Sequence, residues 1–229
     1  MKAMILAAGL GNRMRPLTLH TPKPLLCVAD KPLIVWHIEK LKAIGVKHIV
    51  INTAWLGEKL AAALGDGSQL GVEILWSHEG EGLETAGGII RALPLLGDEP
   101  FILINGDVWT TMDFSSLLDI ELKDALAHLV LVDNPVQHPQ GDFCLAETKA
   151  YTFDQAMQGE HLTFSGISVL SPKLFAGLEE GKRPLAPLLK QAMLNHQVDA
   201  SKLQGAWVDV GTPERLSDLD QHIRQGLFD

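Results

Sequence analysis

The sequence predicts an α/β fold with a Rossmann-like, mostly parallel open sheet that carries helices on both faces. Two observations lead to this expectation. Over residues 1–105, short apolar runs alternate with segments of helical periodicity, so that four strands enclose three helices. The last of these runs, Phe101–Asn105, is almost entirely apolar, as is typical of a strand in the middle of a parallel sheet.

The elements of this first half follow from their residues. Strands are expected at Met4–Ala8, His48–Thr53, Val72–Trp76 and Phe101–Asn105, with helices between them at Leu33–Ile44, Leu56–Leu64 and Ala86–Leu96. The first two helices stop at Gly45 and Gly65, which are typical C-terminal capping residues. Ligands of such sheets bind beyond the carboxyl ends of the strands, so we expect the site in the loops that follow Ala8 and Asn105.

The second half is less regular. Further strands are expected at Leu126–Val132, Asp142–Glu147 and Phe164–Leu170, forming a small additional β region, and helices at Pro184–Asn195 and Pro213–Leu227. The last helix has its proline at an early helical position, directly after Thr212. No internal repeat or flexible linker interrupts the chain, so we expect one domain over residues 1–229.

Composition excludes several classes of protein. Of the 229 residues, 46% are hydrophobic and 21% are charged, which excludes a disordered chain, and no run of 18 apolar residues predicts a membrane span. The net charge of −9 argues against binding to nucleic acid or to an anionic membrane. Residues 1–8 lack the cleavage site of a secretory leader, and Cys27 and Cys144 are expected to be free thiols, so we expect a cytoplasmic protein.

The loop after the first strand carries an excess of positive charge. Gly9 and Gly11 allow a tight turn that brings backbone N–H groups close to a ligand. The loop has Met14 where a dinucleotide-binding motif needs a third glycine, and it contains no Gly-Lys-Ser/Thr phosphate motif. What remains is the glycine turn, Arg13, and Lys23 held between two prolines. This arrangement favours a cradle for a polyphosphate, and the alternative is a solvated basic loop.

Two carboxylates are candidates for a metal site. Asp107 directly follows the strand that ends at Asn105, and Asp209 lies just before the helix that begins at Pro213. Mg²⁺ typically takes one or two carboxylates together with substrate phosphates and water, so two carboxylates beside a phosphate cradle predict bound Mg²⁺. The alternative for each is an aspartate that stabilises a turn or caps a helix.

These motifs together resemble a known family. The run from Leu6 to Pro32 contains Leu-Ala-Ala-Gly-x-Gly-x-Arg-x-x-Pro-Leu-Thr, then Pro-Lys-Pro-Leu, then Lys-Pro, and is similar to the signature of the sugar-1-phosphate nucleotidyltransferases. The resemblance continues in four later segments, Thr85-Ala86-Gly87, Asn105-Gly106-Asp107, Phe164-Ser165-Gly166 and Val208–Pro213. Residues 140–143 and 162–167 are similar to those of short bacterial members that use UTP and N-acetylmuramate alpha-1-phosphate in peptidoglycan recycling.

The resemblance implies an activity. A nucleoside triphosphate, expected to be UTP, would transfer its nucleotidyl group to a sugar 1-phosphate and release pyrophosphate. Residues to about 110 would bind the nucleotide, and residues from about 111 would bind the sugar. Two alternatives stay open: a mannose-1-phosphate guanylyltransferase or another hexose-1-phosphate enzyme, and a non-catalytic regulatory subunit that senses sugar nucleotides. The chain lacks the C-terminal β-helix with which longer members form trimers, so a monomer is expected.

The resemblance also implies roles for individual residues. Arg13, Lys23 and Asp107 are expected to be catalytic, and Asp107 and Asp209 to hold Mg²⁺. The nucleotide is expected to contact Ala8, Gly9, Gly11, Asn12, Arg13, Lys23, Leu83, Glu84, Thr85 and Gly87. The sugar is expected to contact Asn105, Gly141, Glu147, Ser165 and Gly166, although the Glu-Lys-Pro motif that usually contains the glutamate is missing.

Glu84 stands where most family members have glycine. A carboxylate there has several available partners: uracil N3–H, the ribose hydroxyls, or the two donors of guanine. The remaining alternative is an exposed charge without a ligand.

Overall fold

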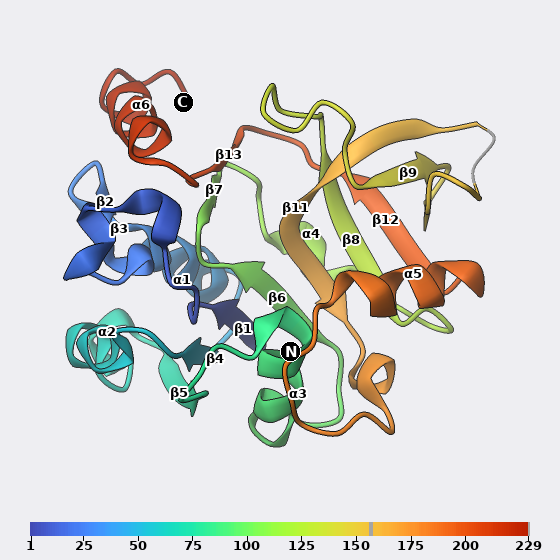
Figure 1. Cartoon of the computed structure of the whole chain (residues 1–229), viewed down its shortest axis with the longest axis horizontal. Coiled ribbons are helices and arrows are strands. Elements are labelled where there is room, and N and C mark those ends of the chain that lie inside the picture. The colour runs from blue at the N-terminus through green and yellow to red at the C-terminus, as the bar shows by residue number, and fades with distance from the viewer. Residues whose placement is uncertain (156–157, 229) are drawn as a thin grey trace.

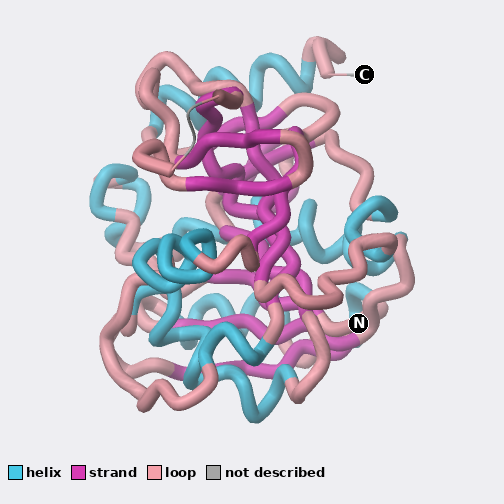
Figure 2. Tube along the Cα trace, turned by 90° about the vertical axis from the view of Figure 1, so that its right-hand side faces the viewer, coloured by secondary structure: helices cyan, strands magenta, loops and turns pink. Residues whose placement is uncertain are grey.

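A nine-stranded sheet runs through the molecule in the computed structural model, which describes residues 1–155 and 158–228 (Figure 1). The strand order is β5-β4-β1-β6-β11-β8-β12-β10-β9. Viewed from the side, the strands form a twisted central layer with helices to either side (Figure 2). None of the helices within the described ranges is long and apolar enough to cross a membrane.

The first half is parallel, as expected. Strands β1 (Ala3–Leu6), β4 (His48–Thr53), β5 (Glu73–His78) and β6 (Phe101–Asn105) pair in parallel, and α1 (Leu33–Ala43), α2 (Gly57–Leu64) and α3 (Glu84–Leu96) connect them. The bounds of β4 and β6 match those expected from the sequence. Because β1 lies between β4 and β6, the loops after β1 and β6 leave the same edge of the sheet side by side.

The alternation of side chains along β1 builds both faces of the core. Ile5 packs on one face with α1 and α2, through residues such as Ile38 and Leu60. Met4 faces the other way and packs with α3 and with α5 (Ala186–Leu194). Since both faces of these strands are buried, the strands are apolar at nearly every position.

The second half is mixed, so the parallel arrangement expected for most of the sheet is limited to the first half and the β8–β12 pair. Strand β11 (Glu160–Leu170) is antiparallel to β6 and to β8 (Ala127–Val132). It also pairs with β9 (Phe143–Ala146), which continues through β10 (Lys149–Tyr151) and β12 (Val198–Lys202) back to β8. The five strands β8, β9, β10, β11 and β12 therefore pair in a closed ring. This ring is the additional β region expected from the sequence.

Two short ribbons complete the fold. Strand β7 (Val108–Thr110) pairs with β13 (Trp207–Asp209), and β2 (Cys27–Val28) pairs with β3 (Lys31–Pro32). Helix α6 (Pro213–Arg224) packs over them through a third apolar cluster, while the short α4 (Ser115–Leu118) follows β7. The Arg224 guanidinium donates to both carboxylate oxygens of Asp30 at 3.0 Å, so the C-terminal helix is joined to the N-terminal segment.

Candidate active site

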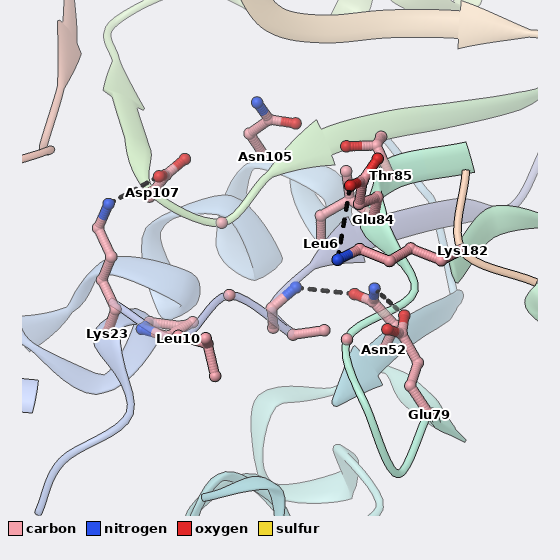
Figure 3. A pocket seen from close by; sticks show the side chains of 16 residues that line it. Leu6, Leu10, Lys23, Asn52, Glu79, Glu84, Thr85, Asn105, Asp107 and Lys182 are labelled. Atoms are coloured by element: carbon pink, nitrogen blue, oxygen red, sulfur yellow. Dashed lines mark hydrogen bonds and ion pairs between the residues drawn. The ribbon is translucent and has the colours of Figure 1, made fainter. Parts of the chain in front are cut away.

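A chain of hydrogen bonds holds the loop after β1 in place. The Ala7 N–H donates to Asn52 Oδ1 at 2.8 Å, and Asn52 Nδ2 donates to Glu79 Oε1 at 2.6 Å. The other oxygen of Glu79 accepts from the Leu83 N–H at 2.9 Å. Asn52 and Glu79 are buried, so these bonds form in a poorly solvated environment. The network joins the loop after β1 to the N-terminus of α3 (Figure 3).

These segments surround a cavity of about 380 Å³, here named the central cavity. Residues expected to bind nucleotide line it, and they come from three separate stretches of the chain. They are Ala8 and Gly9, Lys23, and Glu84 and Thr85. Asp107, expected to be catalytic and to hold Mg²⁺, lines the cavity as well. The Gly106 N–H donates to the Leu6 carbonyl at 2.9 Å, which brings the loops after β1 and β6 together at the floor of the cavity.

Lys23 points at Asp107 across this cavity. Its Nζ lies 2.7 Å from Asp107 Oδ2, and the Lys23 side chain is only 10% exposed, whereas that of Asp107 is 36% exposed (Figure 3). Lys23 begins a short 3₁₀ helix, Lys23–Leu25, and Pro22 and Pro24 restrict its backbone. The ammonium group is therefore held in one place beside a carboxylate that keeps an open side.

The β7–β13 ribbon brings the two candidate metal ligands together. Asp209 is opposite Val108 in this ribbon, and the Val210 N–H donates to the Asp107 carbonyl at 2.9 Å. Both carboxylates line a second cavity of about 390 Å³, here named the carboxylate cavity, which also contacts Arg13 and Asn105. Two residues 102 positions apart in the chain thus share one site.

Two arginines accompany Asp209. Arg215, on the first turn of α6, donates from Nη1 to the Asp209 carbonyl at 3.1 Å and to its carboxylate. Arg13 reaches the same place from the first loop. A Cβ on Gly211 would lie 3.1 Å from Asp209 Oδ2 and 3.2 Å from Arg13 Nη1, so these two side chains converge there. Lys23 next to Asp107, and Arg215 and Arg13 next to Asp209, supply the positive charge expected for an anion site.

The donor set suits a divalent cation that also binds the substrate. No group of three or more histidine, cysteine, aspartate or glutamate side chains gathers as a metal site in the described ranges. Asp107 and Asp209 would supply two oxygen ligands. Asp107 already pairs with Lys23, and Asp209 with Arg215. Two carboxylates completed by phosphate oxygens and water form a set that Mg²⁺ accepts. The residues present fit Mg²⁺ in that form.

Asn105 is the meeting point of the cavities. It lines both the central cavity and the carboxylate cavity at the end of β6. Its amide lies against Gly166, where a Cβ would come within 2.7 Å of Asn105 Nδ2, and Gly166 has a φ of 80° that favours glycine. A β-bulge between Phe164 and Ile167 creates this contact, and the buried Ser165 hydroxyl donates to the Val130 carbonyl at 2.7 Å. The Phe-Ser-Gly motif therefore shapes the wall of the site.

Glu84 adopts an unusual backbone conformation at the rim of the central cavity. Its φ is 60°, a left-handed value that costs a non-glycine residue roughly 1–2 kcal/mol. Glycine, which the family resemblance implies at this position, adopts this conformation without that cost. The Glu84 carboxylate lies 3.8 Å from Lys182 Nζ, and Figure 3 shows the two side chains next to each other.

Several residues expected in the site lie elsewhere. Gly87 packs under the backbone of Gly181, whose carbonyl would be 2.3 Å from a Cβ, and it does not line the cavity. Gly141 lies against Asn134 and Leu162 and lines neither the central nor the carboxylate cavity. Glu147 is exposed at the bend between β9 and β10, where the bend turns its side chain outward.

Three further residues were expected to contact the nucleotide: Leu83, Gly11 and Asn12. They do not line the central cavity but belong to the segments around it. The Leu83 carbonyl accepts from the Arg183 N–H at 2.9 Å, which fixes the segment that carries Lys182. The Gly11 carbonyl accepts from the Thr18 hydroxyl at 2.7 Å, and Asn12 opens the 3₁₀ helix that contains Arg13.

Sequence reasoning missed Asn52, Glu79, Lys182 and Arg215. Asn52 is a polar residue near the end of an apolar strand, β4, which is the one signal that could have drawn attention to it. Glu79 and Lys182 lie in irregular segments, and their places depend on the packing of those segments against α3. Arg215 could have been noticed as an arginine in the first turn of a helix, where a negative charge is more usual.

Comparisons with known proteins identify the family of the chain. A family model described as nucleotidyl transferase matches residues 2–226. The chain is 51% identical to an N-acetylmuramate alpha-1-phosphate uridylyltransferase of Neisseria meningitidis serogroup B, over 95% of this chain and 96% of that protein. It is 30% identical to a mannose-1-phosphate guanylyltransferase catalytic subunit beta of Danio rerio, over 93% of this chain and 62% of that protein.

A solved structure shows the same fold. The structure of a putative glucose-1-phosphate thymidylyltransferase from Bacillus anthracis superposes with a TM-score of 0.86, at 22% identity, and the match covers 98% of this chain and 95% of that one. With the family model spanning nearly the whole sequence, the chain belongs to the nucleotidyl transferase family and is a sugar-1-phosphate nucleotidyltransferase.

Proposed function

We propose that this enzyme transfers a uridylyl group from UTP to N-acetylmuramate alpha-1-phosphate and releases pyrophosphate, a step of peptidoglycan recycling in the cytoplasm. The observation that carries the proposal is the 51% identity, over nearly the full length of both chains, to a uridylyltransferase with that substrate. The meeting of Lys23, Arg13, Asp107 and Asp209 around adjoining cavities supports it chemically.

The nucleophile needs no general base. An oxygen of the sugar phosphate, ionised at neutral pH, attacks the α-phosphorus of UTP in line, and the bond to pyrophosphate breaks. The site therefore acts by positioning the two phosphates and by stabilising charge. Lys23 binds the α-phosphate and the incoming sugar phosphate from the central cavity. Arg13 binds the β- and γ-phosphates and stabilises the departing pyrophosphate.

Asp107 and Asp209 would hold Mg²⁺, with phosphate oxygens and water as the remaining ligands. Bound there, Mg²⁺ would neutralise phosphate charge and align the two reactants. Arg215 acts on this pair as a positioning residue, because its two hydrogen bonds fix the Asp209 carboxylate relative to its own backbone.

The uracil and ribose occupy the part of the central cavity near Ala8, Gly9 and Glu84. The open end of that cavity at Asn105 leads toward the sugar side of the molecule. Asn105 contacts the sugar there, and the backbone of Ser165 and Gly166 completes the wall.

A substrate panel tests the proposal. The purified enzyme is incubated with UTP, GTP, dTTP or CTP, each combined with the 1-phosphates of N-acetylmuramate, N-acetylglucosamine, glucose and mannose, and pyrophosphate release is measured. We expect the highest kcat/KM with UTP and N-acetylmuramate 1-phosphate. A maximum with GTP and mannose 1-phosphate would replace the proposal by a guanylyltransferase. Absence of pyrophosphate release with every pair would favour a regulatory protein.

A further inference from the structure

Two guanidinium groups meet beside Gly211. A Cβ on this glycine would lie 3.0 Å from Arg215 Nη2 and 3.2 Å from Arg13 Nη1, so both side chains reach the same point. Arg13 comes from the loop after β1 and Arg215 from the first turn of α6, so only the fold brings them together. Like charges this close repel each other, and Asp209 can neutralise only one of the two. The pair therefore favours the binding of a further anion.

Arg215 is able to hold Asp209 and to bind an anion at the same time. Its hydrogen bonds to the Asp209 carbonyl and carboxylate both come from Nη1. A guanidinium has five N–H donors in a planar fork, so Nη2, which lies beside Gly211, has donors of its own for another acceptor. Arg13 contributes a second fork at the same place. Two such forks match a ligand that carries two phosphate groups.

Arg215 lines a further cavity of about 440 Å³, here named the outer cavity. This cavity adjoins the carboxylate cavity, with which it shares Pro135, Gln137, Trp207 and Asp209. Since Arg13 lines the carboxylate cavity and Arg215 the outer cavity, the junction lies between the two arginines. Asp133, also on the wall of the outer cavity, already pairs with Lys202, whose Nζ lies 2.6 Å from its carboxylate. An anion therefore has room to approach both guanidinium groups.

We propose that Arg215 is a second arginine of the pyrophosphate site, so that Arg13 and Arg215 together bind the leaving group beside Gly211. This inference rests on the proposed function for the identity of the leaving group, but its binding test needs no turnover. When the bond to the α-phosphorus breaks, the oxygen of the pyrophosphate keeps the electron pair, and the negative charge of the leaving group increases. Arg13 binds one of its phosphate groups and Arg215 Nη2 the other. Arg215 thus touches the leaving group itself while its Nη1 positions Asp209.

The test compares the two products as ligands. Dissociation constants of inorganic pyrophosphate and of UDP-N-acetylmuramate are measured by titration calorimetry at one fixed Mg²⁺ concentration, in the wild type and in Arg215→Lys. A lysine keeps the charge and is able to pair with Asp209, but its single nitrogen cannot also reach a phosphate beside Gly211. We expect pyrophosphate to bind about tenfold or more weakly, the scale of one hydrogen bond to a charged group, and UDP-N-acetylmuramate to bind as before.

Two results would overturn the inference. Equal weakening of both products would mean that Arg215 acts only through Asp209, on which both ligands depend. Unchanged affinity for pyrophosphate in a folded Arg215→Lys protein would mean that Arg215 makes no contact with it.

The matched control is Arg224→Lys, the same substitution at the other end of α6. Arg224 binds Asp30 and Asp220 and lines neither the carboxylate cavity nor the outer cavity. Both dissociation constants should stay at their wild-type values. An equal loss of pyrophosphate binding in Arg224→Lys would show that any arginine of this helix has the same effect, and would contradict a contact specific to Arg215.

Gly211→Ala decides the matter if Arg215→Lys fails to fold. The φ of Gly211 is not left-handed, so its backbone accepts alanine, and the new methyl group would stand against both guanidinium groups. We expect the affinity for pyrophosphate to fall more than the affinity for UDP-N-acetylmuramate, and an unchanged ratio of the two would contradict the inference. The proposed function fails separately, through the absence of pyrophosphate release in the substrate panel. If the panel identifies another nucleotide sugar, that product replaces UDP-N-acetylmuramate in the titrations.

Discussion

The ammonium nitrogen of Lys23 lies 2.7 Å from the carboxylate of Asp107, although 84 positions separate the two residues. The loop after β1 and the end of β6 therefore share one charge pair at the carboxyl edge of the sheet. Before substrate binds, each group neutralises the other. When phosphates enter, Lys23 is already placed to meet them, so little reorganisation is needed.

Lys23→Ala tests the role of this ammonium group. We expect turnover to fall by roughly 10²–10³, the effect of losing one preorganised donor that stabilises developing charge. Asp107 keeps 36% exposure of its side chain, so water can solvate it once it is unpaired, and Tm should fall by no more than about 5 °C. Pyrophosphate release and a thermal melt provide the two readouts. A variant that unfolds near room temperature would show that Lys23 serves the fold.

Arg13→Lys tests the need for a guanidinium. The variant keeps the positive charge, but a single ammonium cannot form the planar fork that binds two phosphate oxygens, so most activity should be lost. Arg15→Lys is the matched control, because Arg15 is an exposed residue of the same loop that lines neither the central nor the carboxylate cavity. Equal rates for the two variants would count against a phosphate contact by Arg13.

The left-handed backbone at Glu84 predicts an unusual order of stabilities. Glu84→Gly removes the steric strain, whereas Glu84→Ala keeps it, so the glycine variant should be more stable by about 1 kcal/mol. Both variants lose the exposed pair with Lys182 equally. Arg91, an exposed residue within α3, is the control site. There Arg91→Gly should be less stable than Arg91→Ala, because glycine is the poorer helix former by about 1 kcal/mol. Chemical denaturation of the four variants measures both differences.

Buried His37 predicts a pH dependence of stability. Burial is the main cause that lowers its pKa to about 4, and Lys40 acts in the same direction, while the Val108 carbonyl and Asp107 oppose it. The folded protein keeps His37 neutral, while the unfolded chain protonates it near pH 6.5, so stability is lost as the pH falls from about 6.5 to about 4. The full loss would be about 3 kcal/mol.

The check is the free energy of unfolding from pH 7.5 to 4.5 in the wild type and in His37→Gln, which cannot titrate at this position. The wild-type curve should fall more steeply between pH 6.5 and 4.5. Parallel curves would mean that His37 does not titrate differently in the folded and unfolded states.

The parallel half of the fold could be predicted because its strands are buried on both faces, and such strands are apolar at nearly every position. The expected bounds of β4 and β6 match the structure. The short strands β7 and β13 could not be predicted, since three residues show no periodicity and their pairing joins positions about 100 apart. That pairing is what brings Asp209 to Asp107.

Local motifs predicted the site where the loop itself determines the geometry. The glycine turn and the two prolines around Lys23 act within a few residues, and the structure places Lys23 at the cavity. Glu147 was expected in the site from the family resemblance, but a bend between β9 and β10 turns it outward. Asn52 and Glu79 escaped notice because their hydrogen bonds join three separate segments.

Asp107 and Asp209 are proposed to act as one unit on the phosphates. The most direct test is pyrophosphate release at varied Mg²⁺ by Asp107→Asn, Asp209→Asn and the double variant. We expect each single change to abolish turnover almost completely and the second to add little to the first, as for groups that act together. A thermal melt of each variant confirms that it is folded. A double variant whose rate equals the product of two modest single effects, or wild-type activity that survives exhaustive chelation, would contradict a shared Mg²⁺ site at Asp107 and Asp209.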